Sequence, residues 1–376
     1  MTQLPGSANV LAINAGSSSV KAALFRAGDP PTELLRDKLE HVASPDDVIA
    51  WLEAKNATAN LAGIAHRLVH GGSDHTAPAI VTAKLFHDLE KLKALDPTHL
   101  PAELALIAAF ANHWPDVPQI ACFDTAFHRD IPSVASTLPI PRRYKSQGIR
   151  RYGFHGISYE YLMEELARLA GPEAARGRVI LAHLGAGASL AAVKDGRGID
   201  TTMSFTPTAG LVMATRTGDL DPGVLIHLLR AEKLSTDHLD HLVNRESGLL
   251  GISETTADVR TLLAHEASDP RAAEAIAVFC YQARKWIGAM AAALGGLDTL
   301  VFAGGIGENA AEIRTRICKD LTFLGVRIAS ERNVACAAVI SEDDAPVTVR
   351  VIRTNEEAML ARNAFRLLAS VPASTS

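Results

Sequence analysis

The chain has 376 residues and a formal net charge of −5, with 48% hydrophobic and 21% charged residues. At about 150 residues per domain this length predicts two or three domains, or one large one, and the apolar fraction is sufficient for packed cores. We find no basic stripe of the kind that nucleic-acid binding uses, and no uncharged apolar run of about 18 residues. Neither a nucleic acid nor a membrane is therefore expected as a partner.

The cysteines and the first residues indicate a compartment. Four cysteines are present, none of them in a CxxC pair: Cys122, Cys280, Cys318 and Cys336. Isolated thiols in a chain of this length are typical of a reducing environment. The opening residues lack the basic region of a signal peptide, so we expect a cytoplasmic protein.

Strand-length apolar runs end repeatedly in glycine-rich or polar turns. The predicted strands are, in chain order, 10–13, 20–25, 64–69, 119–123, 179–184, 189–193 and 300–303. Helical patterns lie between them at 83–95, 101–113, 158–170 and 270–294, and another helix begins after Asp221. This alternation predicts an α/β fold.

Two helix starts carry residues of interest. Ser158 is the predicted N-cap of the helix at 158–170. Thr354, followed three residues later by Glu357, predicts a capping box. Glu357 would then be structural, which leaves Glu356 able to act on solvent or a metal.

The segments 11–19 and 181–189 resemble one another, since each reads as a strand, a small-residue turn and a second strand. Their spacing of about 170 residues is too long for a solenoid repeat. It fits two related lobes with a cleft between them. Chance is the alternative, because glycine turns often follow strands.

Common catalytic signatures are absent. The chain contains neither the P-loop pattern GxxxxGK[ST] nor HExxH or GxSxG. Gly185-x-Gly187 lacks the third glycine of the dinucleotide fingerprint. What remains is a set of small-residue turns beside unusual polar residues.

Polar groups gather on the predicted hairpin from Asn14 to Lys21, which carries Ser17 and Ser19. Hydroxyls and backbone N–H groups on a tight turn can cradle phosphate oxygens. A plain hairpin turn is the structural alternative. We favour the phosphate site because a lysine follows the serines.

Arg67 lies inside an apolar strand, where a buried cation is costly unless it is paired. Asp124 directly follows another apolar strand, at the edge where parallel sheets place their active residues. Arg67 therefore either faces a cleft or pairs with a carboxylate. A buried Arg67–Asp124 ion pair and an active-site role are compatible.

Three further segments suit anion or nucleotide contact. His155 precedes a helix start, where free N–H groups and the helix dipole favour anions. Arg216 lies in a loop dense in charge, and phosphoryl transfer needs such a cation. The glycines of 304–307 permit close approach of a base or ribose. Each segment can also be interpreted as a capping loop or a turn with no ligand.

Eight motifs occur in the order seen in acetate kinases, and the chain resembles that family over nearly its whole length. They are NAGSSSVK (14–21), HRLVHGG (66–72), FDTAFH (123–128), RYGFHG (151–156), HLG (183–185), TRTGDLDP (215–222), GGIGEN (304–309) and TNEE (354–357). The resemblance implies an α/β fold of duplicated ribonuclease H-like, actin-like ATPase lobes with an interlobe cleft. The first lobe would comprise 1–126 plus 357–376, on the acyl-substrate and phosphate side. The second lobe, 127–356, would bind nucleotide and form a homodimer interface.

The reaction implied by the resemblance is ATP plus acetate giving ADP plus acetyl phosphate, with Mg²⁺ or Mn²⁺. The implied catalytic residues are Asp124, Arg216 and His155. The implied acyl-substrate residues are Arg67 for the carboxylate and an apolar pocket of Val69, Thr98, Phe154 and Pro207. The implied nucleotide and phosphate residues are Ser17, Ser19, Lys21, His183, Gly185, Gly187, Asp258, Arg260, Gly304, Gly305, Ile306, Gly307 and Asn309. The implied metal-site residues are Asn14 and Glu356.

The expected chemistry needs no general base, because a carboxylic acid substrate with a pKa near about 4 is already ionised at neutral pH. Catalysis would consist of positioning two anions and neutralising their charge. Asp124 is accordingly expected to orient the metal or Arg67 rather than to abstract a proton.

The chain departs from the family pattern at Tyr159, Ala186, Ala188 and Thr98. These changes remove a histidine, an amide and a hydroxyl, and place a threonine where the acyl pocket has a leucine. A propionate- or butyrate-type acyl kinase is therefore the main alternative. A non-catalytic nucleotide-binding regulator is the alternative from another class.

Overall fold

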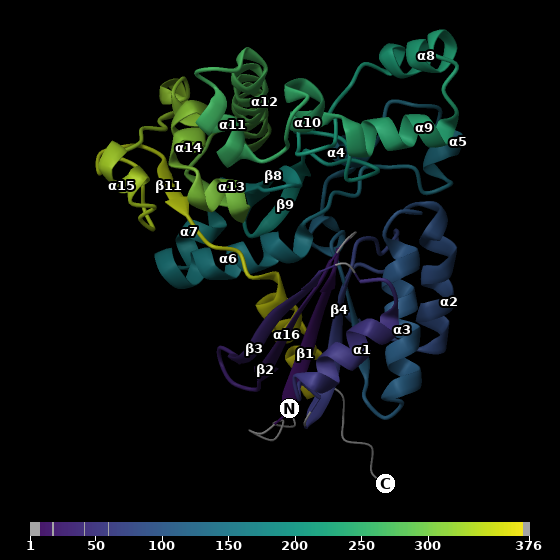
Figure 1. The fold of residues 1–376 in the computed structure, drawn as a ribbon. Helices are drawn as coiled ribbons and strands as arrows, with labels where there is room; N and C mark the ends of the chain where they lie inside the picture. The colour runs from purple at the N-terminus through teal and green to yellow at the C-terminus, as the bar shows by residue number, and fades with distance from the viewer. Residues whose placement is uncertain (1–7, 17–18, 41, 59, 371–376) are drawn as a thin grey trace. The chain divides into compact units, whose positions relative to one another are not determined.

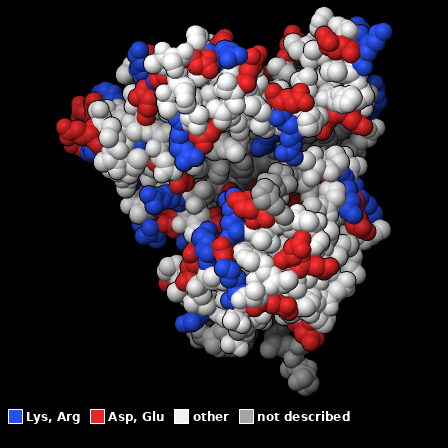
Figure 2. Space-filling view, in the orientation of Figure 1, with Lys and Arg blue, Asp and Glu red and all other residues white. Residues whose placement is uncertain are grey.

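A computed structural model of the chain describes residues 8–16, 19–40, 42–58 and 60–370, which form two compact units of α/β structure (Figure 1). The first unit comprises Met1–Arg129, Gly156–Tyr161 and Asn355–Ser376, and the second comprises Asp130–His155 and Leu162–Thr354. Within the described ranges no helix combines the length and apolar character needed to cross a membrane. Acidic and basic side chains are interspersed on the face that Figure 2 shows.

The first unit contains a mixed sheet with the strand order β3-β2-β1-β4-β6-β5. Its strands are β1 (Asn9–Ala15), β2 (Ser19–Arg26), β3 (Thr32–Glu40), β4 (Leu61–Leu68), β5 (Ala79–Ile80) and β6 (Gln119–Phe123). β1, β4 and β6 are parallel neighbours, whereas β1, β2 and β3 form an antiparallel meander. Three strands therefore end at the same edge of the sheet.

Helices cover both faces of this sheet. They are α1 (Pro45–Ala54), α2 (Ala83–Lys91), η1 (Leu92–Ala94), α3 (Leu100–His113), η2 (Ala126–His128) and α16 (Glu356–Ser370). Side chains alternate along a strand, so Leu11 and Ile13 of β1 pack with α1 and α3, and Val10 and Ala12 pack with Met359 of α16. Burial on both faces explains why β1 reads as a continuous apolar run.

The second unit contains a mixed sheet with the strand order β11-β10-β7-β8-β9. Its strands are β7 (Val179–Leu184), β8 (Ala188–Lys194), β9 (Arg197–Thr201), β10 (Thr299–Ala303) and β11 (Thr348–Val351). Its longer helices are α6 (Gly156–Ala170), whose first residues group with the first unit, α8 (Pro222–Ala231), α12 (Pro270–Leu294) and α14 (Ala311–Cys318). Its shorter helices are α4 (Ser133–Ser136), α5 (Arg142–Lys145), α7 (Pro172–Arg176), α9 (Thr236–His241), η3 (Leu242–Glu246), α10 (Gly248–Ser253), α11 (Val259–His265), α13 (Gly304–Asn309), η4 (Thr322–Leu324) and α15 (Ser330–Val334).

The two sheets share one topology. The order β3-β2-β1-β4-β6 corresponds to β9-β8-β7-β10-β11, with an antiparallel meander followed by two parallel strands in each case. The segments 11–19 and 181–189 occupy equivalent hairpins, β1–β2 and β7–β8. The internal repeat predicted from the sequence therefore corresponds to a repeated fold.

The predicted N-cap of α6 is wrong. The helix begins at Gly156, and its N-cap is His155 in the left-handed region at φ 60°, not Ser158. The Gly156 N–H donates to the carbonyl of Asp124 at 2.9 Å, and a Cβ on Gly156 would lie 2.1 Å from that oxygen. Only glycine allows this approach, so the helix starts two residues earlier than predicted.

In the predicted capping box of α16, the bond from the Thr354 N–H to the Glu357 side chain does not form, because both groups have other partners. The backbone N–H of Thr354 donates to Glu308 at 3.0 Å. The Glu357 carboxylate accepts from Asn14 and Arg36 instead. The side chain of Asn355 accepts from the Ala358 N–H at 3.0 Å, which satisfies a donor of the first turn.

Candidate functional site

Arg67 and Asp124 form an ion pair at the edge where β1, β4 and β6 end. Arg67 lies near the end of β4, and Asp124 directly follows β6. The Oδ2 atom of Asp124 accepts from Nη2 of Arg67 at 2.6 Å and from Nε at 3.0 Å. The register pairs Arg67 with Cys122 on the neighbouring strand. Parallel pairing therefore brings together two residues that are 57 positions apart.

Four donor interactions hold the guanidinium of Arg67. Besides the two bonds to Asp124, its Nη1 donates to the carbonyl of Ala15 at 3.3 Å and lies 3.5 Å from Oε1 of Glu103. Arginine carries five N–H donors, so one remains without an acceptor among the described residues. The side chain is 16% exposed. It can donate that remaining hydrogen to a bound carboxylate.

Burial and neighbouring charge shift the pKa values of this pair. Burial alone lowers the pKa of Arg67, but the carboxylates of Asp124, Glu103 and Glu356 outweigh it and raise the value. The pKa of Asp124 is also raised, chiefly by burial and further by Glu356, against the opposing effect of Arg67. Arg67 is therefore a permanent cation in a strongly acidic neighbourhood.

The predicted metal residues, Asn14 and Glu356, are in contact. Nδ2 of Asn14 donates to Oε2 of Glu356 at 2.8 Å and to Oε1 of Glu357 at 3.0 Å. Arg36 of β3 donates to Glu357 and, at 2.7 Å, to Asn355. The first turn of α16 is thereby fixed against the end of β1.

The oxygen atoms near this turn fit a hard divalent cation. Oδ1 of Asp124 is buried and has no hydrogen-bond partner in the described part of the chain. Glu356 is close enough to influence the pKa of Asp124. No group of three or more His, Cys, Asp or Glu is arranged to hold a metal among the described residues. A Mg²⁺ ion would therefore depend on water and substrate phosphates for most of its ligands, as is usual for this ion.

The β1–β2 hairpin forms as predicted, with Asn14 opposite Lys21 and Ala15 opposite Val20. The Gly16 N–H donates to the carbonyl of Ser19 at 2.8 Å, which closes the turn. Lys21 is exposed. Ser17, a predicted phosphate residue, lies outside the described residues.

The predicted acyl-pocket residues divide between the units. Val69, which is buried, and Thr98, which is exposed, belong to the first unit. The Thr98 N–H donates to Asp96 at 3.1 Å, in the turn before α3. Phe154, which is buried, and Pro207 belong to the second unit.

In the second unit His155 lies against the β7–β8 hairpin. Its ring stacks on that of His183, with centroids 4.4 Å apart and planes inclined by 25°. Its Nδ1 atom is 2.9 Å from Oγ of Ser189, which is the cross-strand partner of His183. When the hydroxyl donates to Nδ1, the other ring nitrogen carries the proton and can donate to an anion.

Arg216 and His155 meet at the turn of the same hairpin. A Cβ placed on Gly187 would lie 2.6 Å from Nη2 of Arg216 and 3.1 Å from Nε2 of His155. Nη1 of Arg216 donates to the carbonyl of Pro207 at 2.7 Å. Two groups that can carry positive charge therefore converge beside Gly187.

The GGIGEN segment forms helix α13 beside this hairpin. Gly304 has φ 75°, and a Cβ on it would lie 2.7 Å from the carbonyl of Leu184. Oε1 of Glu308 accepts from the Gly304 N–H at 2.9 Å. The segment's remaining predicted nucleotide residues are exposed Gly305, half-buried Ile306, buried Gly307, and Asn309, whose Nδ2 donates to the carbonyl of Gly305.

The predicted nucleotide residues Asp258 and Arg260 have a local structural role. The carboxylate of Asp258 accepts from the backbone N–H groups of Arg260 and Thr261, so it caps α11. Arg260 pairs with Asp258 at 2.7 Å, and its side chain is 90% exposed. Gly185 instead lies in the β7–β8 turn, where its N–H donates to the carbonyl of Gly187 at 3.0 Å.

The departures from the family pattern have different surroundings. Tyr159 is fully buried and packs against the rings of Phe127 and His128, with centroids 5.7 Å away in both cases. Ala188 is fully buried opposite Leu184. Ala186 is exposed, and its carbonyl accepts from the Ala214 N–H at 3.1 Å, which ties the loop before Arg216 to the hairpin turn.

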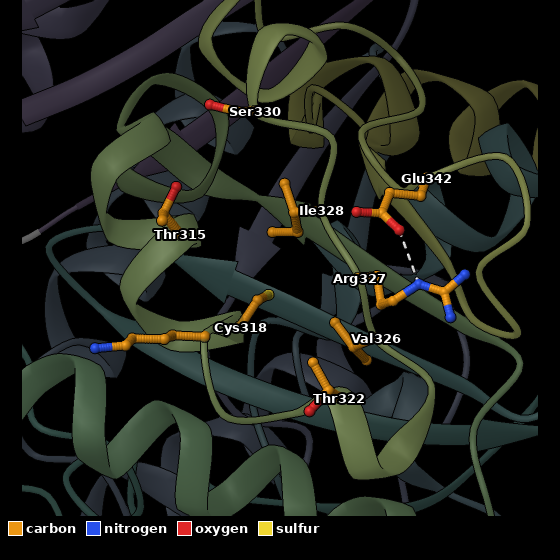
Figure 3. Close-up of a pocket in the computed structure, with 9 residues that line it drawn as sticks. Thr315, Cys318, Thr322, Val326, Arg327, Ile328, Ser330 and Glu342 are labelled. Carbon is orange, nitrogen blue, oxygen red and sulfur yellow. Dashed lines mark hydrogen bonds and ion pairs between the residues drawn. The ribbon is translucent and has the colours of Figure 1, made fainter.

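A separate pocket of about 290 Å³ lies in the second unit, between α14, η4 and the segment from Val326 to Ser330 (Figure 3). Arg327 donates to Glu342 at 2.8 Å on its wall. None of the residues that line it was predicted as a site residue. It is therefore distinct from the groups described above.

Four residues that contact the groups above were not predicted from the sequence: Glu103, Arg36, Ser189 and Arg314. Arg314 is fully buried, and its Nη1 donates to the carbonyls of Gly307 and Glu308, at the end of α13. Glu103 offered a signal, because it lies on the apolar stripe of α3 with Leu100, Leu104 and Ile107. A charged residue on such a stripe predicts a buried partner.

Comparisons with known proteins agree over nearly the whole chain. A family model described as the Acetokinase family matches residues 48–362. A protein named acetate kinase from Rhodopseudomonas palustris (strain ATCC BAA-98 / CGA009) is 42% identical over 391 residues, covering 95% of this chain and 98% of that protein.

Solved structures extend the likeness to the fold. The crystal structure of Porphyromonas gingivalis acetate kinase matches with a TM-score of 0.88 and 33% identity, over 96% of this chain and 100% of that one. A propionate kinase from Francisella tularensis subsp. tularensis SCHU S4 matches with a TM-score of 0.89 and 33% identity, over 95% and 98%. These matches confirm the predicted α/β class and the actin-like ATPase fold.

Proposed function

The chain belongs to the acetokinase family, and from this premise we propose that it transfers the γ-phosphoryl group of ATP to acetate. The products are ADP and acetyl phosphate. The observation that carries the proposal is the ion pair of Arg67 and Asp124 at the edge of the sheet, in which the guanidinium keeps one donor that no described residue accepts. A planar guanidinium matches the geometry of a carboxylate.

The substrate carboxylate needs no deprotonation at neutral pH, because its pKa lies near about 4. Asp124 therefore acts by orienting Arg67. Arg67 holds the carboxylate so that one oxygen attacks the γ-phosphorus in line with the leaving ADP oxygen. The first unit supplies the acyl-substrate side of the reaction in this proposal, and the second unit supplies the nucleotide side.

Arg216 and His155 neutralise charge on the transferring phosphoryl group. Their convergence beside Gly187 supports this role. The bond between Nδ1 of His155 and Ser189 keeps the ring in one orientation. The short GGIGEN helix, with its tight contact at Gly304, offers a backbone surface for the adenosine.

Asn14, Asp124 and Glu356 are the residues that would hold Mg²⁺. The ion supplies charge neutralisation on the phosphate oxygens. Within the chain, Asn14 orients Glu356 through its 2.8 Å hydrogen bond. Arg36 and Glu357 keep the start of α16 in place behind them.

Propionate is the second candidate substrate, since the structural match to a propionate kinase is as strong as that to an acetate kinase. One methylene changes specificity by only about 1–3 kcal/mol. Exposed Thr98 makes one edge of the proposed acyl pocket partly polar, which favours the smaller substrate.

We also propose a homodimer formed through the second unit. Val224 and Ile226 of α8 are 43% and 47% exposed, which supports an apolar contact there. Sedimentation equilibrium of the wild type and of Ile226→Glu tests it. A dimer that the substitution dissociates supports the proposal, and a monomeric wild type contradicts it.

The reaction is tested by trapping acyl phosphate with hydroxylamine and measuring kcat/KM for acetate, propionate and butyrate. We expect product from all three at high concentration, with acetate preferred. A preference for propionate would make the chain a propionate-type kinase. Measurable ATP binding without any acyl hydroxamate would instead identify a nucleotide-binding regulator.

A further inference from the structure

Glu103 is a charged side chain on the buried stripe of α3. It lies in the first turn of the helix, between Leu100 and Leu104, and its side chain is only 3% exposed. A carboxylate in this position is costly unless its oxygen atoms have partners. Those partners connect the helix to the proposed carboxylate site.

Both oxygen atoms of Glu103 contact that site. Oε2 accepts from the backbone N–H of Val69 at 3.0 Å, and Oε1 lies 3.5 Å from Nη1 of Arg67. Val69 follows the end of β4, so its N–H has left the β-ladder and Glu103 satisfies it. Removing the carboxylate would leave a buried donor unsatisfied.

The start of α3 is fixed beside the same residues. Asp96 accepts from the N–H groups of Thr98 and His99 at 3.1 and 2.9 Å, and α3 begins at Leu100. Thr98 is a proposed acyl-pocket residue. Glu103 therefore links the start of the helix that follows Thr98 to two residues proposed to touch the acyl substrate, Arg67 and Val69.

The charges that face Glu103 explain why its interaction with Arg67 is weaker than that of Asp124. Burial raises the pKa of Glu103 to about 8, with further increases from Asp124 and Asp96, while Arg67 and the Val69 N–H oppose the shift. The close partner of Arg67 is Asp124 at 2.6 Å, and the more distant one is Glu103. Glu103 thus limits the position of the Arg67 guanidinium, but it competes only weakly with a substrate carboxylate for the positive charge of that group.

We propose that Glu103 is a positioning residue that holds Arg67 and the Val69 turn in the arrangement that binds the carboxylate substrate. This inference rests on the proposed function for the identity of that substrate. Misplacing a binding group by about 1 Å can cost up to about 10²-fold in rate. Loss of Glu103 should therefore weaken binding of the acyl substrate and leave binding of the nucleotide unchanged.

The test compares Glu103→Leu and Glu103→Gln with the wild type. Glutamine keeps an oxygen for the Val69 N–H but brings an amide N–H₂ toward Arg67. We expect the KM for acetate to rise at least about 10-fold in Glu103→Leu and by about 3- to 10-fold in Glu103→Gln. The KM for ATP should stay within about twofold, which also reports that the variants are folded.

Glu165→Gln is the matched control, because Glu165 is also a buried helical glutamate with an arginine partner, Arg168 at 2.7 Å. It should leave both KM values unchanged. A KM for acetate within about twofold of the wild type in Glu103→Leu would overturn the proposal. So would equal increases in the two KM values.

A binding measurement separates this inference from the proposed reaction. The rise in Tm with added acetate reports binding without turnover. If the wild type makes no acyl phosphate but the rise is lost in Glu103→Leu, the reaction is wrong and the role of Glu103 stands. If the wild type is active and Glu103→Leu keeps the full rise, the reaction stands and the role of Glu103 is wrong.

Discussion

Nη2 of Arg67 lies 2.6 Å from Oδ2 of Asp124, which is almost completely buried. The contact joins the ends of two adjacent parallel strands, β4 and β6. Because Asp124 has little access to solvent, water cannot compensate the charge of its carboxylate. Each member of the pair therefore constrains the other, in stability as well as in the proposed chemistry.

Replacing Arg67 by methionine should destabilise the fold by about 3–5 kcal/mol, because Asp124 would remain buried without its cation. Urea unfolding at neutral pH measures the loss. The double variant Arg67→Met with Asp124→Leu should recover much of it, since no unpaired charge remains. If the single variant is as stable as the wild type, the ion pair does not contribute this amount to the free energy of unfolding.

Replacing Arg216 by alanine should lower kcat by about 10³ or more, as for other arginines that stabilise phosphoryl transfer. Steady-state assays with saturating ATP and acetate measure it. Arg332→Ala is the control, because Arg332 forms an ion pair with Asp343 away from the predicted residues. A decrease in kcat of less than about tenfold would show that Arg216 does not act directly in phosphoryl transfer.

Replacing Gly187 by alanine should reduce kcat by more than about tenfold with little change in Tm. The added methyl group would lie 2.6 Å from Nη2 of Arg216, the flexible end of a side chain, which can move aside. Gly304→Ala should instead lower Tm, because its φ is 75° and the methyl group meets the carbonyl of Leu184. Equal effects of the two substitutions on Tm would contradict this distinction.

The stability of the wild type should fall, relative to Glu103→Gln, as the pH rises from about 4.5 to about 8. Burial raises the pKa of Glu103 to about 8 in the folded chain, against about 4.3 for an exposed glutamate. Between these values the folded chain holds a proton that the unfolded chain has released, so the free energy of unfolding decreases with pH. Parallel pH profiles for the two proteins would rule out the raised pKa.

Glu356→Gln should raise the Mg²⁺ concentration that gives half-maximal activity, because a carboxylate oxygen binds this ion more strongly than an amide does. Titration of activity against Mg²⁺ at fixed ATP measures the shift. The nearby Glu357 is held by Asn14 and Arg36, so Glu357→Gln should act mainly on Tm. An unchanged Mg²⁺ requirement in Glu356→Gln would exclude it from the metal site.

Features that depend on neighbouring strands could be predicted from the sequence. The sequence places Asp124 at the edge where an apolar strand ends, and a buried arginine such as Arg67 calls for a cleft or a carboxylate partner. The parallel register between β4 and β6 brings the two residues together. The repeated hairpins were visible for the same reason. A period of two along a strand and a turn at its end are local signals.

Features that depend on distant contacts could not be predicted. Ser158 had the residue type of an N-cap, but the approach of Gly156 to the carbonyl of Asp124 starts α6 earlier. The capping box failed because Glu308, 46 positions away, takes the Thr354 N–H. Local pattern contains no information about such competing partners.

Phosphoryl transfer from ATP to a short carboxylate can be followed by ³¹P NMR of a reaction mixture of enzyme, ATP, Mg²⁺ and acetate. We expect acetyl phosphate and ADP to appear in equal amounts, and both to form about 10³-fold more slowly in Arg216→Ala. Release of inorganic phosphate in place of acetyl phosphate would contradict it, as would an unchanged ATP spectrum.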